Sequence, residues 1–188
     1  MSSVRANIDD MGISRLVIRD ATAADAAACA AIYAPYVTET AVSFETEAPS
    51  VADMAARIVS ARDEYAWIVL EDDGVVVGYA HGGSHKARAA YRWSCEVSIY
   101  MQMGRRRTGG GRLLYRELFA RLAARGYRTA VAGVALPNDA SVGVHTAMGF
   151  EQVGVYKRIG WKNGAWHDVA WFQVALTDHG DEPPQAIS

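Results

Sequence analysis

The sequence predicts a mixed α/β domain in which helices cover a largely antiparallel sheet. Three observations lead to this fold class. Segments rich in β-branched and aromatic residues are interspersed with segments whose apolar residues recur at helical spacing. Two of the β-rich segments flank the turn Asp73-Gly74, which is typical of an antiparallel hairpin. Finally, 188 residues with 51% hydrophobic and 21% charged side chains match one ordinary soluble domain.

The domain is expected to span residues 15–176. Residues 1–14 form a polar leader that we expect to be flexible, and residues 177–188, which include Pro183 and Pro184, form a tail that we expect to be disordered. The sequence contains no internal repeat and no linker that would divide the domain.

The first half of the domain is expected to contain one strand, two helices and a hairpin. Thr22 and Asp25 resemble a capping box that opens an alanine-rich helix. Ser50, with Asp53 three residues later, has the same role for a second helix. The expected elements are a strand over 16–19, helices that end near Tyr36 and Arg62, and hairpin strands over 66–70 and 75–80.

The second half is expected to alternate strands and helices and to finish with two strands. Leu113, Leu114, Leu118 and Leu122 recur at helical spacing, and Gly126 is placed to end that helix. The expected elements are strands over 95–101 and 129–135, helices over 110–125 and 138–148, and final strands over 153–159 and 169–176.

The charge balance argues against nucleic acid or a membrane as partner. The chain has 19 Lys and Arg residues and 21 Asp and Glu residues, a net charge of −2, so an anionic ligand would need a local cluster of positive charge.

Cys29 and Cys95 are too few for a zinc site or a disulfide framework, and we expect no metal. With no signal peptide and no membrane-spanning segment, we expect a cytoplasmic protein.

A local cluster of positive charge lies in the glycine-rich segment 104–112, between an expected strand and an expected helix. The first N–H groups of a helix have no helical partner, and glycines let the backbone approach a phosphate, so the segment predicts an anion site. Its arginines, Arg105, Arg106, Arg107 and Arg112, add charge-assisted contacts. The segment matches neither the Walker phosphate-binding motif nor the glycine fingerprint of dinucleotide-binding proteins. A solvated flexible loop and a nucleic-acid patch are the alternatives, the second being disfavoured because no aromatic residues interleave the arginines.

The run 106–111 resembles the Q/R-x-x-G-x-G/A loop with which GNAT acetyltransferases hold the pyrophosphate of acetyl-CoA. The resemblance covers about residues 16–176 and narrows to the phosphinothricin acetyltransferase-like branch through segments 86–93, 136–139 and 163–169. Met103 departs from this branch, which often has proline there, and we expect the change to alter loop stiffness more than chemistry. The resemblance implies a GNAT-type fold for the domain and acetyl-CoA as co-substrate. The cofactor-binding residues it implies are Met101, Gln102, Met103, Arg106, Arg107, Thr108, Gly109, Gly110, Gly111, Arg112, Asn138 and Ser141.

Transfer of an acetyl group to an amine needs a base for the amine proton and a polarised thioester carbonyl. Alternation along the strand over 95–101 places Glu96, Ser98 and Tyr100 on one face, and a polar face on a central strand suggests a cleft. Burial there would raise the pKa of Glu96 toward the working pH. The resemblance implies the same residue as general base. A backbone N–H near Met101 or Met103 would polarise the carbonyl if this strand parts from its neighbour; the alternative for Glu96 is a structural ion pair.

Asn138, Ser141 and His145 are spaced three and four residues apart and share one helix face. By resemblance this face looks toward the pantetheine arm, with Asn138 bonded to the cofactor and His145, a second catalytic residue, near the amine. The alternative for His145 is a histidine bonded to a backbone carbonyl. Cys95, on the other face of the strand from Glu96, is expected to be a core residue.

For the acceptor, Lys86, Arg88 and Tyr91 form a polar set just before the strand of Glu96. The guanidinium of Arg88 can hold a carboxylate or phosphinate bidentately. By resemblance this segment contacts the acidic part of an amino-acid-like substrate, and Phe44 and Ser98 also belong to the substrate pocket. The alternative is that these charges belong to a solvated loop.

The favoured hypothesis is direct acetyl transfer from acetyl-CoA to a small amine of the phosphinothricin or methionine sulfoximine type. A non-catalytic acyl-CoA-binding module and an acetyltransferase for protein amines are the alternatives. Trp161, Trp166 and Trp171 are expected to contribute to the core and to a homodimer contact rather than to a ligand cage.

Overall fold

The computed structural model describes residues 16–105, 109–178 and 180. The expected leader, most of the expected tail and the site candidates Arg106, Arg107 and Thr108 therefore lie outside the described residues. Seven strands form one sheet in the order β1-β2-β3-β4-β5-β7-β6. Every neighbouring pair is antiparallel except β4 and β5, which confirms the mixed, largely antiparallel sheet. The strands are β1 Leu16–Asp20, β2 Trp67–Asp72, β3 Val75–Ser84, β4 Ser94–Met101, β5 Thr129–Ala135, β6 Glu151–Lys162 and β7 Ala165–Ala175.

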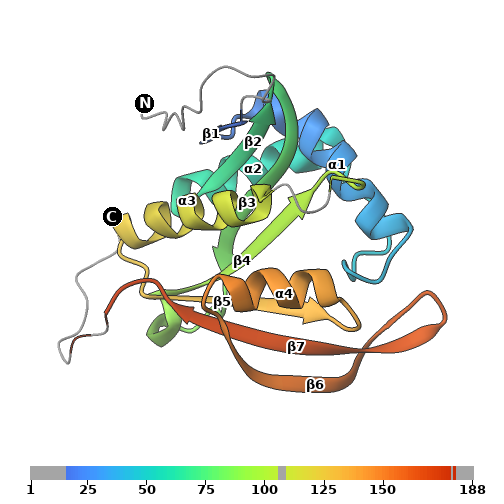
Figure 1. Cartoon of the computed structure of the whole chain (residues 1–188), viewed down its shortest axis with the longest axis vertical. Coiled ribbons are helices and arrows are strands. Elements are labelled where there is room, and N and C mark those ends of the chain that lie inside the picture. Colours follow the sequence, from blue (N-terminus) through green and yellow to red (C-terminus); the bar gives the residue numbers. More distant parts are fainter. Residues whose placement is uncertain (1–15, 106–108, 179, 181–188) are drawn as a thin grey trace.

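Helices cover both faces of the sheet (Figure 1). The described helices are α1 Ala26–Thr38, α2 Val51–Glu64, α3 Gly110–Ala124 and α4 Asp139–Ala147, with short 3-10 turns at Ala23–Asp25 and Ala89–Tyr91. Helices α1 and α2 pack on one face around Met54, Ile58 and Trp67. Helices α3 and α4 pack on the other face, where α3 buries Leu114, Tyr115, Leu118 and Leu122. The leucine spacing therefore identified the buried side of α3.

Local signals set most of the element ends. The side chain of Ser50 accepts a hydrogen bond from the backbone N–H of Asp53, so α2 begins with the expected capping box. The box at Thr22 opens a 3-10 turn before α1 rather than α1 itself. At the turn between β2 and β3, Asp73 and Gly74 both have positive φ angles, 49° and 81°, as a two-residue hairpin turn requires.

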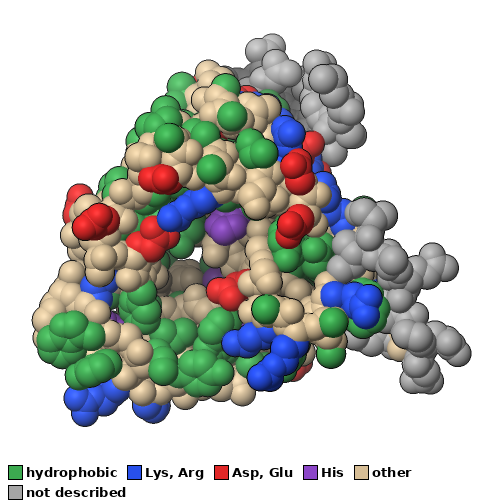
Figure 2. Space-filling model, turned by 180° about the vertical axis from the view of Figure 1, so that it is seen from behind, with side chains coloured by type: hydrophobic (Ala, Val, Ile, Leu, Met, Phe, Trp, Pro, Cys, Tyr) green, Lys and Arg blue, Asp and Glu red, His purple; other side chains and the backbone are tan. Residues whose placement is uncertain are grey.

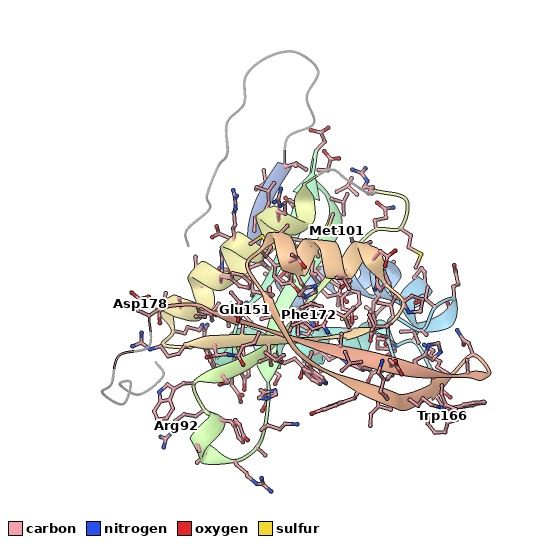
Figure 3. All side chains as sticks on the ribbon, turned by 60° about the horizontal axis from the view of Figure 1, so that its bottom comes forward. Arg92, Met101, Glu151, Trp166, Phe172 and Asp178 are labelled. Atoms are coloured by element: carbon pink, nitrogen blue, oxygen red, sulfur yellow. The ribbon has the colours of Figure 1, made fainter. Side chains whose placement is uncertain are left out.

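The last two strands are longer than expected, because β6 and β7 form one hairpin from Glu151 to Ala175. Its turn is Asn163-Gly164, with φ angles of 50° and 74°. An Asn-Gly pair is a strong hairpin signal, and it would have placed these strand ends correctly. Trp166 lies at the tip of this hairpin, away from the body of the sheet (Figure 3). The expectation that Trp161 and Trp166 help to build the core is wrong, because they are 59% and 50% exposed.

The sheet parts between β4 and β5. Their parallel ladder joins three residue pairs, from Ser94 with Thr129 to Glu96 with Val131. Strand β4 continues to Met101 along β3, while β5 continues to Ala135 along β7. The predicted polarisation of the thioester carbonyl requires this strand to part from its neighbour. That separation is present, and it begins directly after Glu96.

Candidate active site

Two cavities meet at β4, and both are lined by Ser98 and Tyr100. The larger, of about 630 Å³, lies on the face covered by α1 and α2. The smaller, of about 50 Å³, lies between the separated parts of β4 and β5. The face seen from behind has a hollow with a histidine side chain inside it and charged side chains around it (Figure 2). The polar face predicted for β4 therefore borders a cleft.

The small cavity contains the expected polar face of α4. Asn138, Ser141 and His145 all line it, opposite Ile99 and residues 132–135 of β5. Asn138 is the N-cap of α4, and its side-chain oxygen accepts a hydrogen bond from the Ser141 N–H at 3.1 Å. These residues form one wall of the gap that the β4–β5 splay creates.

Two glycines with positive φ angles precede α3. Gly104 and Gly109 have φ angles of 88° and 77°, and a Cβ built on either would meet no atom of the described residues within 4 Å. Behind these glycines the packing is close, since a Cβ on Gly111 would lie 3.3 Å from Ile99. The first amides of a helix lack helical acceptors, so this end of α3 fits a phosphate group. Arg105 forms an ion pair with Asp72, and Arg112 is exposed.

Two backbone groups at the end of β4, where cofactor contacts are predicted, already have hydrogen-bond partners. They are the Met101 carbonyl and the Gln102 N–H. The Met101 carbonyl accepts a hydrogen bond from the Tyr36 hydroxyl at 2.7 Å. The Gln102 N–H donates to the Val77 carbonyl at 2.8 Å. Met103 follows the strand and is exposed. Gln102, one of the predicted cofactor-binding residues, therefore points its N–H toward β3 rather than into the gap.

Glu96 is half-buried at the point where β4 and β5 separate. It pairs with Gly83, which lines the large cavity, and it shares the face of Ser98, which lines both cavities. Glu96 itself is not among the lining residues of either cavity. Burial raises the pKa of its carboxyl group, and the nearby Lys86 ammonium partly opposes that rise. The expected direction of the pKa shift is confirmed.

His145 is 3% exposed and has both ring nitrogens engaged. Its Nδ1 lies 2.7 Å from the Ser141 carbonyl oxygen, which only accepts, so Nδ1 carries the proton. Its Nε2 then accepts from the Tyr115 hydroxyl at 2.8 Å. Burial lowers the pKa of the ring. The carbonyl-bonded histidine that was the alternative interpretation is the arrangement found, and neither nitrogen is free to take a proton from an amine.

The residues predicted to bind the acceptor are only partly brought together. Ser98 lines both cavities. Lys86, Arg88 and Tyr91 are exposed on the segment between β3 and β4, and they line neither cavity. Phe44 packs over the backbone of Gly160 and near the His167 ring, with 39% of its surface exposed. Cys95, in contrast, is fully buried on the opposite face of β4, as expected.

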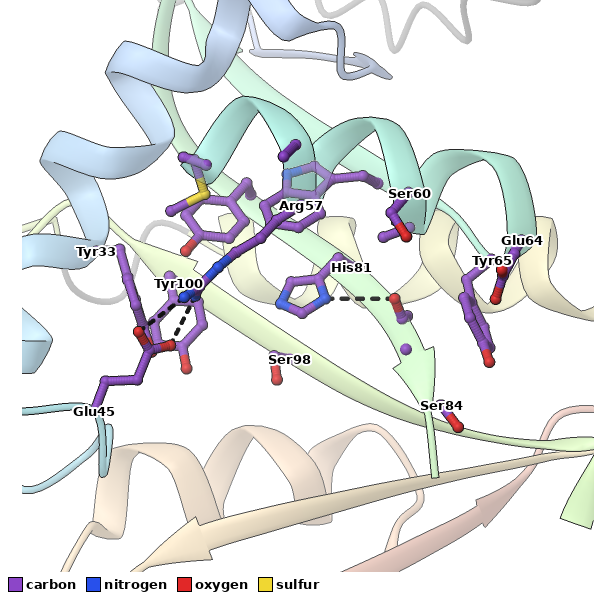
Figure 4. A pocket seen from close by; sticks show the side chains of 17 residues that line it. Tyr33, Glu45, Arg57, Ser60, Glu64, Tyr65, His81, Ser84, Ser98 and Tyr100 are labelled. Atoms are coloured by element: carbon purple, nitrogen blue, oxygen red, sulfur yellow. Dashed lines mark hydrogen bonds and ion pairs between the residues drawn. The ribbon is translucent and has the colours of Figure 1, made fainter. Parts of the chain in front are cut away.

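Two polar features of the large cavity, and a third outside its lining, were not predicted from the sequence. Arg57 of α2 and Glu45 of the loop after α1 form a bidentate ion pair in the lining, with N–O distances of 2.7 and 3.0 Å (Figure 4). His81 stacks on Trp67 at 4.3 Å between ring centroids, and burial lowers its pKa to about 4. His85 has a buried Nδ1 atom without a partner in the described part of the chain. These side chains carry no local motif, so only the tertiary structure reveals them.

The loop between α1 and α2 is held by a buried lysine of β6. The Lys162 ammonium donates to the carbonyl oxygens of Val37, Ser43 and Glu45 at 2.6, 2.6 and 2.8 Å. The side chains of this loop reach both cavities, Val42 into the small one and Glu45 into the large one. Lys162 therefore fixes a wall that the two cavities share.

A gap in the sheet, a glycine-rich start of α3 and a second cavity across β4 together fit an acyl-CoA-dependent transferase. The family model described as "Acetyltransferase (GNAT) domain" matches residues 18–171. The chain belongs to the GNAT acetyltransferase family, and it is an N-acetyltransferase that uses acetyl-CoA as co-substrate. The resemblance seen in the sequence is thereby confirmed.

Relatives place the chain near enzymes for amino acid analogues. It is 40% identical over 156 residues to a phosphinothricin N-acetyltransferase of Streptomyces viridochromogenes, with 83% of this chain and 85% of that one covered. It is 34% identical to an L-methionine sulfoximine/L-methionine sulfone acetyltransferase of Pseudomonas aeruginosa, over 85% and 94%. A solved phosphinothricin acetyltransferase from Sinorhizobium meliloti, in complex with acetyl-CoA, superposes with a TM-score of 0.87 at 34% identity and covers 92% and 95%.

None of the described helices has the length and apolar character needed to cross a membrane.

Proposed function

We propose that this chain transfers the acetyl group of acetyl-CoA directly to the amine of a small amino-acid-like acceptor, of the phosphinothricin or methionine sulfoximine type, with Glu96 as general base. The observation that carries the proposal is the meeting of two cavities at Ser98 and Tyr100, two and four residues beyond Glu96 on the same strand. The gap between β4 and β5 suits the narrow arm of a coenzyme, and the large cavity suits the acceptor. The names of the relatives above support the acceptor class.

The phosphate end of the co-substrate fits the glycine-rich start of α3. Gly109, Gly110 and Gly111 would bring backbone N–H groups close to it, and the neighbouring arginines Arg106, Arg107 and Arg112 would add charge. Asn138 and Ser141 would border the arm in the small cavity. When bound, acetyl-CoA supplies an activated acetyl carbon and a thiolate leaving group.

Glu96 would prepare the acceptor. Its carboxylate takes one proton from the acceptor ammonium, directly or through a water molecule, so that the nitrogen lone pair can form the N–C bond as the C–S bond breaks. The second proton that nitrogen loses goes to the departing thiolate, which leaves as the thiol. Burial raises the Glu96 pKa and so makes the carboxylate a better proton acceptor. His145 would act by fixing α4 and the Tyr115 hydroxyl, since both of its nitrogens are engaged.

The function is tested by thiol release from acetyl-CoA with phosphinothricin, L-methionine sulfoximine, simple amines and peptides with a free N-terminus. We expect turnover with the amino acid analogues and little with the peptides. Preference for peptides would indicate a protein acetyltransferase instead. No turnover with any acceptor would contradict the proposal.

The role of Glu96 is tested by Glu96→Gln, with Glu39→Gln at an exposed position outside both cavities as the control. We expect kcat/KM to fall by about 100-fold or more in the first variant and to stay unchanged in the second. A Glu96→Gln enzyme that keeps the wild-type pH–rate profile would remove Glu96 from this role.

We also propose a homodimer that uses the outer face of β6. This strand lies at the edge of the sheet and exposes Val153, Ile159 and Trp161. Unpaired edges and clustered apolar side chains favour contact with a second copy. Analytical ultracentrifugation should give a molar mass twice that of one chain, and Trp161→Glu should reduce it to the mass of one chain. A monomeric wild-type protein at micromolar concentration would contradict this proposal.

A further inference from the structure

The large cavity has one basic side chain among its described lining residues, and it is not one of those predicted to bind the acceptor. Arg57 projects from α2 into the cavity, whereas Lys86 and Arg88 lie outside it. The other charged groups in the lining are the carboxylates of Glu45 and Glu64. His81, with a pKa of about 4, is neutral at physiological pH. Positive charge within the cavity therefore comes from Arg57.

The guanidinium of Arg57 is held in one orientation. It donates from two nitrogens to the two oxygens of Glu45, and the Tyr33 hydroxyl donates to the same carboxylate at 2.9 Å. A guanidinium has five N–H donors, and this bidentate pair uses two of them. The Arg57 and Glu45 side chains keep 44% and 36% of their surface exposed, so the pair faces open space rather than the core. Arg57 thus has donors left that are oriented in advance.

Charge within the Glu45–Arg57 pair is balanced, and the carboxylate is already satisfied. Both oxygens of Glu45 accept hydrogen bonds, and its neighbour Arg57 holds its pKa below the usual range. A second oxyanion that approaches the free edge of the guanidinium would meet donors rather than an unshielded negative charge. The planar fork of arginine suits both carboxylate and phosphinate oxygens.

We propose that Arg57, oriented by Glu45, binds an oxyanion of the acceptor and so selects amino-acid-like amines over uncharged ones. This inference rests on the proposed function, because it places the acceptor in the large cavity. Two groups could supply the oxyanion: the α-carboxylate, or an acidic group at the far end of the acceptor side chain. Their shared chemistry is a pair of negatively charged oxygens.

The test compares acceptors that differ only in where the oxyanion sits. Phosphinothricin carries both groups, L-methionine sulfone carries the α-carboxylate, (3-aminopropyl)(methyl)phosphinic acid carries the far group, and 3-(methylsulfonyl)propan-1-amine carries neither. kcat/KM is measured by thiol release for wild type, Arg57→Met and the double variant Glu45→Gln/Arg57→Met. The double variant removes the carboxylate that the single one leaves unpaired. Arg62→Met, on the same helix but outside the cavity lining, is the matched control.

We expect both Arg57 variants to lose about 10- to 100-fold in kcat/KM for the acceptors whose oxyanion Arg57 binds, which corresponds to loss of a charge-assisted hydrogen bond. The uncharged amine should change less than about threefold, and KM for acetyl-CoA should stay constant. Loss confined to L-methionine sulfone and phosphinothricin identifies the α-carboxylate. Loss confined to the two phosphinates identifies the far group.

An equal fall for all four acceptors, or no fall for any, would overturn the inference, because the pair would then only hold the loop against α2. A wild-type enzyme inactive on all four compounds would contradict the proposed function and this inference with it. A wild-type enzyme that acetylates them with no Arg57 dependence would contradict the inference alone.

Discussion

The Nε2 atom of His145 lies 2.8 Å from the hydroxyl oxygen of Tyr115, and this hydrogen bond joins α4 to α3 beneath the small cavity. Both groups are buried, so each needs the other as its partner. We predict that Tyr115→Phe lowers the free energy of unfolding by about 1–3 kcal/mol, because it leaves the Nε2 atom without a donor. The same variant should keep kcat/KM within about threefold of wild type. Denaturant unfolding and steady-state kinetics check the two parts, and a large loss of kcat without loss of stability would instead assign a proton-transfer role to this pair.

Lys86 should control the acid limb of the pH–rate profile. Its ammonium lowers the pKa of Glu96, against the rise that burial causes. Lys86→Met removes the positive charge, so the Glu96 pKa rises further and activity falls away at a higher pH than in wild type. Lys86→Arg keeps the charge and should keep the limb in place. Profiles of kcat/KM against pH check this, and a limb that moves down or not at all in Lys86→Met would contradict it.

Lys162 should affect the acceptor more than the co-substrate. Lys162→Met keeps the aliphatic stem but removes the donors to one carbonyl in the last turn of α1 and to two carbonyls of the loop after it. We expect a looser loop, a KM for the acceptor raised by about tenfold, and a smaller change in KM for acetyl-CoA. Lys157→Met is the control on the same strand, since that side chain is 72% exposed. Equal rises in both KM values would point to a general loss of structure.

His81 should make the protein less stable in acid. Its folded-state pKa is lowered to about 4 from an ordinary value near 6.5, so the unfolded chain binds a proton that the folded chain excludes. The stability that neutral His81 contributes is present above pH 6.5 and is lost as pH falls toward 4, by about 3 kcal/mol in all. His81→Phe, which can still stack on Trp67, should flatten this part of the stability profile. Urea unfolding at several pH values checks it, and parallel profiles for the two proteins would refute it.

Much of the fold could be predicted because its signals are local. The cap at Ser50, the turn at Asp73-Gly74 and the leucine spacing of α3 depend on neighbours within a few residues. The same is true of the alternating faces of β4, which separate Glu96 and Ser98 from the buried Cys95.

The site was predicted less completely because cavities form between distant segments. Arg57 and Glu45 are 12 residues apart, and Lys162 contacts carbonyls more than 110 residues earlier in the chain. A buried lysine next to a hairpin turn has the same local sequence as an exposed one. Conversely, Lys86, Arg88 and Tyr91 resemble a binding cluster in sequence, yet they lie on the surface outside both cavities.

The ladder of three residue pairs between β4 and β5 has a counterpart at the other end of the gap. There, Lys162 of β6 holds the loop that follows α1, so a strand from one half of the sheet is tied to a segment from the other half. The opening is thus bounded at its narrow end by backbone hydrogen bonds, while an ammonium group holds the loop whose Val42 side chain lines it. Because the Tyr115–His145 hydrogen bond between α3 and α4 does not depend on that loop, a substitution at Lys162 should alter the loop side of the opening and leave the helix side in place.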